Sequence, residues 1–107
     1  MVKELVTAAG IAERGSRFVK PPEGNYAVWF DDIDTDGPDG TAPMIYRHAV
    51  TLELYTPRPD PDAEAALEQQ MGLRGLHWVK HARYWIQTEQ LYQTIYEFDY
   101  TEKRRIS

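Results

Sequence analysis

Apolar residues recur at helical spacing over the first ten positions of the chain. Val2, Leu5, Val6 and Ala9 follow the i, i+3, i+4, i+7 rule. Gly10 comes directly after them, where glycine commonly ends a helix. The pattern predicts that the protein opens with a short amphipathic helix.

Further along the chain, apolar and polar residues alternate with a period of two. The range 26–30, YAVWF, has the composition of a strand and follows a Pro- and Gly-containing turn at 21–25. A brief strand is predicted before that turn, at 16–19. The range 44–56 alternates over the greatest length and predicts the longest strand. Its core-facing residues are expected to be Val50, Leu52 and Leu54.

A second helix is predicted from residues that favour a helix start. Asp60 is a natural N-cap, and Pro61 fits the first helical position. Gly72 is expected to end this helix. Its predicted buried stripe comprises Ala63, Ala66, Leu67 and Met71.

The last third of the chain is rich in aromatic and β-branched residues. It predicts two strands, at about 77–86 and 91–100, with a turn near 88–90 and a frayed tail at 101–107. Together the elements predict a single α+β domain with an antiparallel sheet of about four strands and two short helices on one face. The other face then meets water or another protein.

An acidic stretch with two glycines and two prolines fills positions 31–43 and is predicted to be a mobile loop. Its beginning, DIDTDG, matches the first half of a calcium loop, with Asp32, Asp34 and Asp36 on alternate positions. The twelfth position should be a bidentate Glu but is Pro43, and strands are expected on both flanks. No metal site is therefore predicted, although the three aspartates leave a small calcium-binding or metal-dependent domain open as an alternative.

Composition and residue types argue against catalysis. The 107-residue chain has no cysteine and a net charge of −5, which disfavours tight nucleic-acid binding. Neither Ser16 nor Ser107 lies in a nucleophile motif. His77 and His81 would stand roughly 13 Å apart on a strand, too far to share an ion, and His48 is interpreted as a structural or surface residue. We expect no enzyme activity, no cofactor, no signal peptide and no membrane span.

Several short motifs in the C-terminal half resemble those of a known family. The order is ELYT at 53–56, the helix start PRPDPDAEAALEQ, then HWVKHARYWI at 77–86 and EQLYQTIYEFDY at 89–100. This is similar to the tail-completion, or tail-terminator, proteins of long-tailed phages and prophages. The resemblance covers about residues 26–100. Trp85 departs from it, because it is an extra residue between the Tyr and the Ile of the family's Tyr-Ile-x-x-Glu segment.

The resemblance implies a structural virion protein rather than an enzyme. Such proteins form a ring, commonly a hexamer, that caps the tail tube and joins it to head-neck proteins, and DNA only passes through the lumen. The resemblance also implies that the protein assembles in the host cytoplasm and is finally located at the head-tail junction of the virion. A head-completion or neck ring protein of the same virion is the alternative. We expect the subunit and partner interfaces to involve Trp29, Asp32, Asp34, Asp36, Asp39, Tyr55, Arg58, Trp85 and Tyr92.

Overall fold

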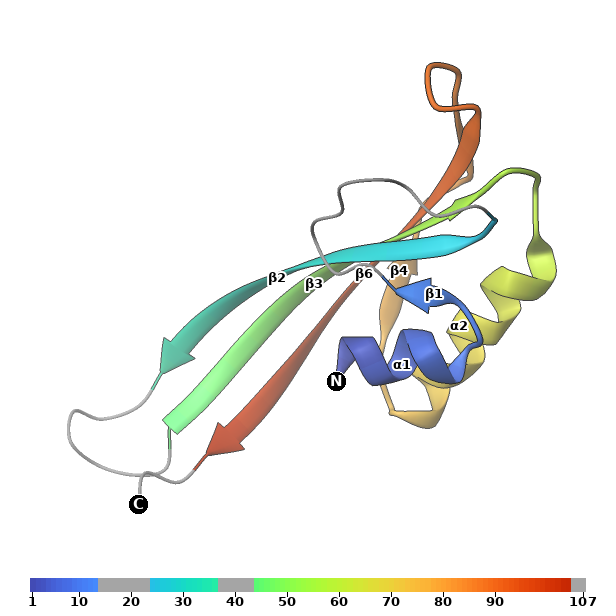
Figure 1. Ribbon diagram of the computed structural model, residues 1–107. Coiled ribbons are helices and arrows are strands. Elements are labelled where there is room, and N and C mark those ends of the chain that lie inside the picture. The colour runs from blue at the N-terminus through green and yellow to red at the C-terminus, as the bar shows by residue number, and fades with distance from the viewer. Residues whose placement is uncertain (14–23, 37–43, 105–107) are drawn as a thin grey trace.

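Three long strands run side by side through the middle of the molecule (Figure 1). The computed structural model describes residues 1–13, 24–36 and 44–104. In chain order the elements are α1 (Val2–Ala8), β1 (Ala12–Glu13), β2 (Tyr26–Asp36), β3 (Met44–Thr56), α2 (Pro61–Leu73), β4 (Trp78–Lys80), β5 (Tyr84–Ile86) and β6 (Leu91–Arg104).

The sheet has the order β1-β2-β3-β6-β4, with β5 also paired to β6. Every pairing is antiparallel except that of β1 with β2. The predicted α+β class is therefore confirmed, with six strands in place of about four. The predicted strand at 77–86 is divided into β4 and β5, because Arg83 leaves the ladder and its Nε lies 2.6 Å from Oε2 of Glu64 on α2. The strand predicted at 16–19 lies outside the described residues.

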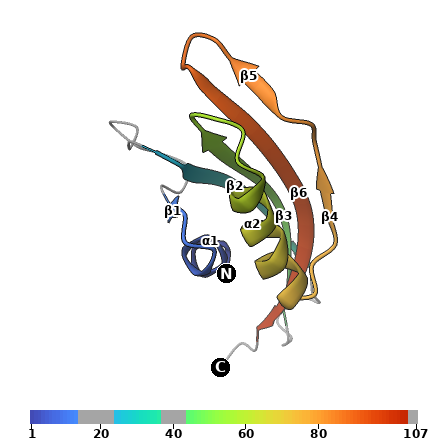
Figure 2. The ribbon, with the colours of Figure 1, turned by 90° about the vertical axis from the view of Figure 1, so that its right-hand side faces the viewer.

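Both helices lie on the concave side of the curved sheet (Figure 2). The side chains that meet there alternate along the strands, as the period of two requires. In β3 the alternation places Leu52 and Leu54 on the helix side, as predicted, and both are fully buried. The core consists of Val2, Leu5, Val6, Ile11, Ala27, Val50, Leu52, Leu54, Leu67, Met71, Leu76, Tyr96 and Phe98.

Helix α2 begins as predicted but ends later. Asp60 accepts a hydrogen bond from the Ala63 N–H at 3.0 Å, and Asn25 Nδ2 donates to its other oxygen at 2.8 Å. The helix continues past Gly72, because the left-handed residue that stops it is Gly75, with φ +71°. Its last carbonyls are then satisfied by the Gly75 and Leu76 N–H groups, at 3.0 Å each. Helix α1 ends in the same way at Gly10, as predicted, with φ +78°.

The acidic stretch is not a loop over its first half. Strand β2 continues through residues 31–36, each paired with a residue of β3, up to Asp36 opposite Ile45. The glycines and prolines that favour a loop all come after position 36, and residues 37–43 lie outside the described part. The prediction of a frayed tail at 101–107 is also wrong for residues 101–104. Strand β6 reaches Arg104, which pairs with Met44. In both places a long-range strand partner overrides the local sequence signal.

Candidate interaction surface

The three long strands extend well beyond the helices (Figure 1). We call this helix-free extension the arm, and define it as residues 31–36 of β2, 44–49 of β3 and 99–104 of β6. No described helix packs on it. The molecule measures 50 Å along its longest axis and 29 and 21 Å along the others, so it is markedly elongated.

A buried histidine holds the strands of the arm together. His48 is only 5% exposed, and its Nδ1 lies 2.8 Å from Oδ2 of Asp31 on β2. Its Nε2 lies 3.2 Å from Oε1 of Glu102 on β6. The imidazole also stacks on the Tyr100 ring, with centroids 4.2 Å apart and planes 6° apart. The two ring nitrogens thus contact a carboxylate on each outer strand, and we call this arrangement across the middle strand the histidine clamp.

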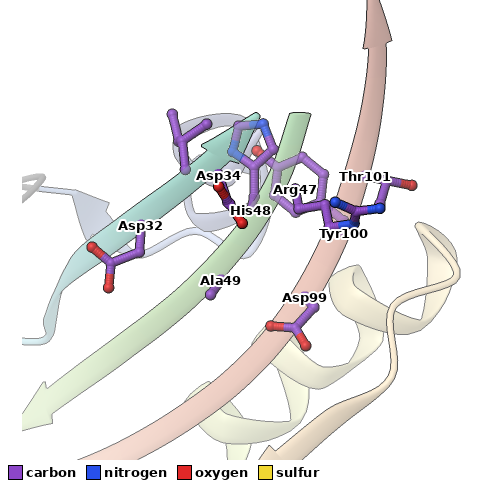
Figure 3. Close-up of a pocket in the computed structure, with 9 residues that line it drawn as sticks. Asp32, Asp34, Arg47, His48, Ala49, Asp99, Tyr100 and Thr101 are labelled. Carbon is purple, nitrogen blue, oxygen red and sulfur yellow. The ribbon is translucent and has the colours of Figure 1, made fainter. Parts of the chain in front are cut away.

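The opposite face of the arm carries most of its charge. Asp32 and Asp34 lie on this face of β2, and the strand register brings Asp34 opposite Arg47 and Asp32 opposite Ala49. Ala49 in turn faces Asp99 on β6. A hollow of about 740 Å³ at the arm is lined by residues of both faces, namely Asp32, Asp34, Arg47, Ala49, Asp99 and Thr101 from this face and Ile33, His48 and Tyr100 from the face of the buried histidine (Figure 3). Three carboxylates against one guanidinium make this face acidic.

A second polar group ties α2 to the sheet. The Glu64 carboxylate is buried, and it meets Lys80 Nζ at 2.8 Å and Arg83 Nε at 2.6 Å. Burial alone would raise the Glu64 pKa, but the two cations outweigh it and the pKa is lowered. Lys80 also bonds Glu68 at 2.8 Å, and Tyr96 donates to the same carboxylate at 2.8 Å. Burial and that carboxylate raise the Tyr96 pKa. This network fixes the helix to β4 and β6 and needs no ligand.

At the other end of the sheet, β5 and the first part of β6 project beyond the helices as a hairpin (Figures 1 and 2). The Trp85 and Tyr92 rings pack against each other there, with centroids 4.8 Å apart. Tyr84 is 65% exposed and Trp85 39%. The hairpin thus presents aromatic surface at a distance from the arm.

The structure separates the predicted interface residues. Asp32 and Asp34 lie on the arm, where Asp36 is the last residue of β2, whereas Trp85 and Tyr92 lie on the hairpin. Trp29 packs against the core, and Asp39 lies outside the described residues. Tyr55 stacks on Tyr26 with centroids 5.0 Å apart and donates to Glu53, and Arg58 is exposed between β3 and α2. The described aspartates of the set thus lie at one end of the sheet and Trp85 and Tyr92 at the other, whereas Trp29, Tyr55 and Arg58 belong to neither the arm nor the hairpin.

The alternate aspartates do not form a calcium loop. A calcium loop wraps its carboxylates around the ion, but residues 32–36 are an extended strand paired with residues 45–49. Within the described residues, no group of three or more His, Asp or Glu side chains could hold a metal ion. The described helices include none that is long and apolar enough to cross a membrane.

Most residues that line the hollow were not among the predicted interface residues, including Arg47, Asp99 and Tyr100, and His48 was interpreted only as a structural or surface residue. One signal was present in the sequence, since His48 lies two residues before Val50 and therefore on the buried face of β3. Its partners Asp31 and Glu102 are 17 and 54 residues away. No local pattern could have joined them.

The architecture places this chain among small α+β proteins with a one-sided sheet and an exposed strand extension. No family model matches the sequence, and no curated protein matches it. Among solved structures, the fold is similar to that of a chain in the virion of a native gene transfer agent (GTA) particle. The TM-score is 0.54 at 14% identity, over 94% of this chain and 83% of that chain. The two chains therefore share a fold.

Proposed function

We propose that this protein is a structural component of a phage-like virion, and that it acts without catalysis as a tail terminator. The observation that carries the proposal is the fold shared along 94% of this chain with a chain of the gene transfer agent virion. The resemblance to tail-terminator proteins over about residues 26–100 supports the same role by an independent route. In this role the protein forms a ring, a hexamer as is common in that family, on the last ring of the tail tube.

The two exposed ends of the sheet suit this task. A subunit of a ring needs surfaces for its neighbours and others for the tube and the head-neck proteins. The arm and the hairpin supply such surfaces at opposite ends of the sheet, and the helix-covered part between them holds them in place. An acidic arm face with Asp32, Asp34 and Asp99 also repels the phosphate backbone, which suits a joint through which DNA moves without sticking.

Imaging of particles made without the gene tests the proposal. Loss of a tail terminator leaves abnormally long or unjoined tails, and the expected result is such tails beside intact filled heads. Restoring the gene on a plasmid should restore joined particles of normal tail length. Filled heads that leak would instead assign the protein to head completion or the neck. Unchanged particles that lack the protein would overturn the virion role altogether.

A further inference from the structure

Within the described residues, each side of the arm ends in a strand edge that carries no further strand. On the outer side of β2, strand β1 pairs only with Tyr26 and Ala27. On the outer side of β6, β4 and β5 pair only with residues 96–98 and 91–93. No strand in the described part of the chain forms a ladder with residues 31–36 of β2 or with residues 99–104 of β6 on these sides. Each edge therefore offers a row of backbone N–H and C=O groups to another strand.

The two edges differ in charge. Residues 31–36 of β2 contain four aspartates and no basic residue. Residues 99–104 of β6 contain two acidic residues and end in Lys103 and Arg104. Two β2 edges would repel each other, whereas a β2 edge and the tip of a β6 edge attract. The charges thus select an unlike pair of edges over a pair of β2 edges.

We propose that the β2 edge of one copy pairs with the β6 edge of a second copy of this chain, so that the arms join head to tail. Both strands run antiparallel to β3, so they run parallel to each other. Copies related by a rotation about an axis along the arms would therefore pair them as parallel strands. The inference rests on the proposed function in one respect, because a closed ring is what such a head-to-tail contact builds.

The register within one arm indicates which residues meet. Asp34 lies level with Thr101 through Arg47, and Asp32 lies level with Asp99 through Ala49. A neighbour at the same level would place two aspartates together. Sliding it by two residues, about 6.6 Å, towards the helices brings Lys103 opposite Asp34 and moves Asp99 away. Strands that close into a ring need such a stagger, and both side chains lie on the face opposite the helices.

The histidine clamp fits this use of the arm. By bonding Asp31 and Glu102 from the middle strand, His48 holds the two outer strands at a fixed spacing. The two edges are then presented ready to pair, with less ordering required on association.

Because the natural chain has no cysteine, a disulfide can test the contact directly. The double variant Asp34→Cys with Lys103→Cys should give, on mild oxidation of the full chain, a ladder of covalent oligomers larger than dimers. The two cysteines cannot bridge within one chain, because they lie two strands apart, more than 9 Å. Each single variant should remain mostly monomeric, since a head-to-tail contact does not place like residues together. Asp34→Cys with Glu89→Cys, which has its second cysteine in the exposed β5–β6 turn, is the matched control and should give no ladder.

Charge reversal tests the same pair through the strength of association. Asp34→Lys should raise the protein concentration needed for association about tenfold, and adding Lys103→Asp should restore it. Glu89→Lys makes the same charge change outside the arm and should leave association unchanged. Circular dichroism and the thermal midpoint establish that each variant is folded before it is compared.

Two results would overturn the edge pairing. One is a folded double-cysteine variant that stays monomeric on oxidation. The other is a Lys103→Cys single variant that forms dimers as efficiently as the double variant does, which would indicate a closed dimer through two β6 edges.

Failure of the edge pairing and failure of the proposed function are distinguishable. Particles that contain the protein at the head-tail joint, but whose double-cysteine form gives no ladder, would refute only the edge pairing. A clear ladder from a protein absent from particles would refute only the virion role.

Discussion

The same three strands form two regions with different sources of stability. In the helix-covered half, the concave face of β2, β3 and β6 is apolar, and its side chains are buried against α1 and α2. In the arm, the strands continue with unbroken pairing, but no helix covers them. Ile33 illustrates the change, since it lies on the same face as fully buried Leu52 and is 55% exposed. Strand pairing can therefore extend a sheet beyond its apolar core, and in the arm backbone hydrogen bonds and charged contacts replace apolar burial.

The largest expected effect is the difference in stability lost when one side chain is truncated in each half. Leu52→Ala leaves a cavity in the covered half and should lower the free energy of unfolding by about 2–5 kcal/mol. Ile33→Ala removes a half-exposed side chain from the arm and should cost less than about 1 kcal/mol. Urea unfolding followed by circular dichroism measures both. Equal costs would mean that the arm is as tightly packed as the core.

The next effect concerns the charge buried under α2. Glu64→Gln keeps the shape of the side chain but removes the charge that holds Lys80 and Arg83. Both cations are partly exposed, at 38% and 36%, so they can regain water. We therefore expect a loss of about 1–2 kcal/mol at neutral pH, below that for a fully buried pair. Glu89→Gln makes the same change in an exposed turn and should cost less than about 0.5 kcal/mol.

The pH dependence of that loss follows from the direction of the pKa shift. The folded-state Glu64 pKa lies below its ordinary value of 4.5. The charged group therefore stabilises the fold fully above that ordinary value, and its contribution is lost as the pH falls through the lower folded pKa. The difference in unfolding free energy between the natural protein and Glu64→Gln should thus shrink between about pH 5 and pH 3. A difference that stays constant over this range would show that Glu64 acts through its shape alone.

Local patterns were sufficient for the two helices and insufficient for Glu64 and for the arm. The spacing of Leu5 and Val6 and the capping residue Asp60 are signals within one turn of chain, so both helices could be predicted. The buried side chain of Glu64 could not, because its partners lie on β4, β6 and the segment between β4 and β5. The strand conformation of residues 31–36 could not be predicted for a similar reason. Their stability depends on pairing with residues 45–50, and an acidic sequence before a Gly/Pro-rich segment reads locally as a loop.

The smallest effect should be confined to the arm. His48→Gln removes a ring that bonds carboxylates on both outer strands and stacks on Tyr100. A glutamine has both of its N–H donors on one nitrogen, so it does not replace two ring nitrogens that face different strands, and it has no ring to stack. We therefore expect local opening of the arm to become about tenfold more frequent. Hydrogen exchange followed by mass spectrometry should show faster exchange in residues 31–35, 45–49 and 99–103. The amides of Leu52 and Tyr96, in the covered half, should exchange as before. His77→Gln changes an exposed histidine outside the arm and is the matched control. Faster exchange throughout the molecule would contradict the division into two regions, because it would mean that the clamp stabilises the whole sheet and not the arm.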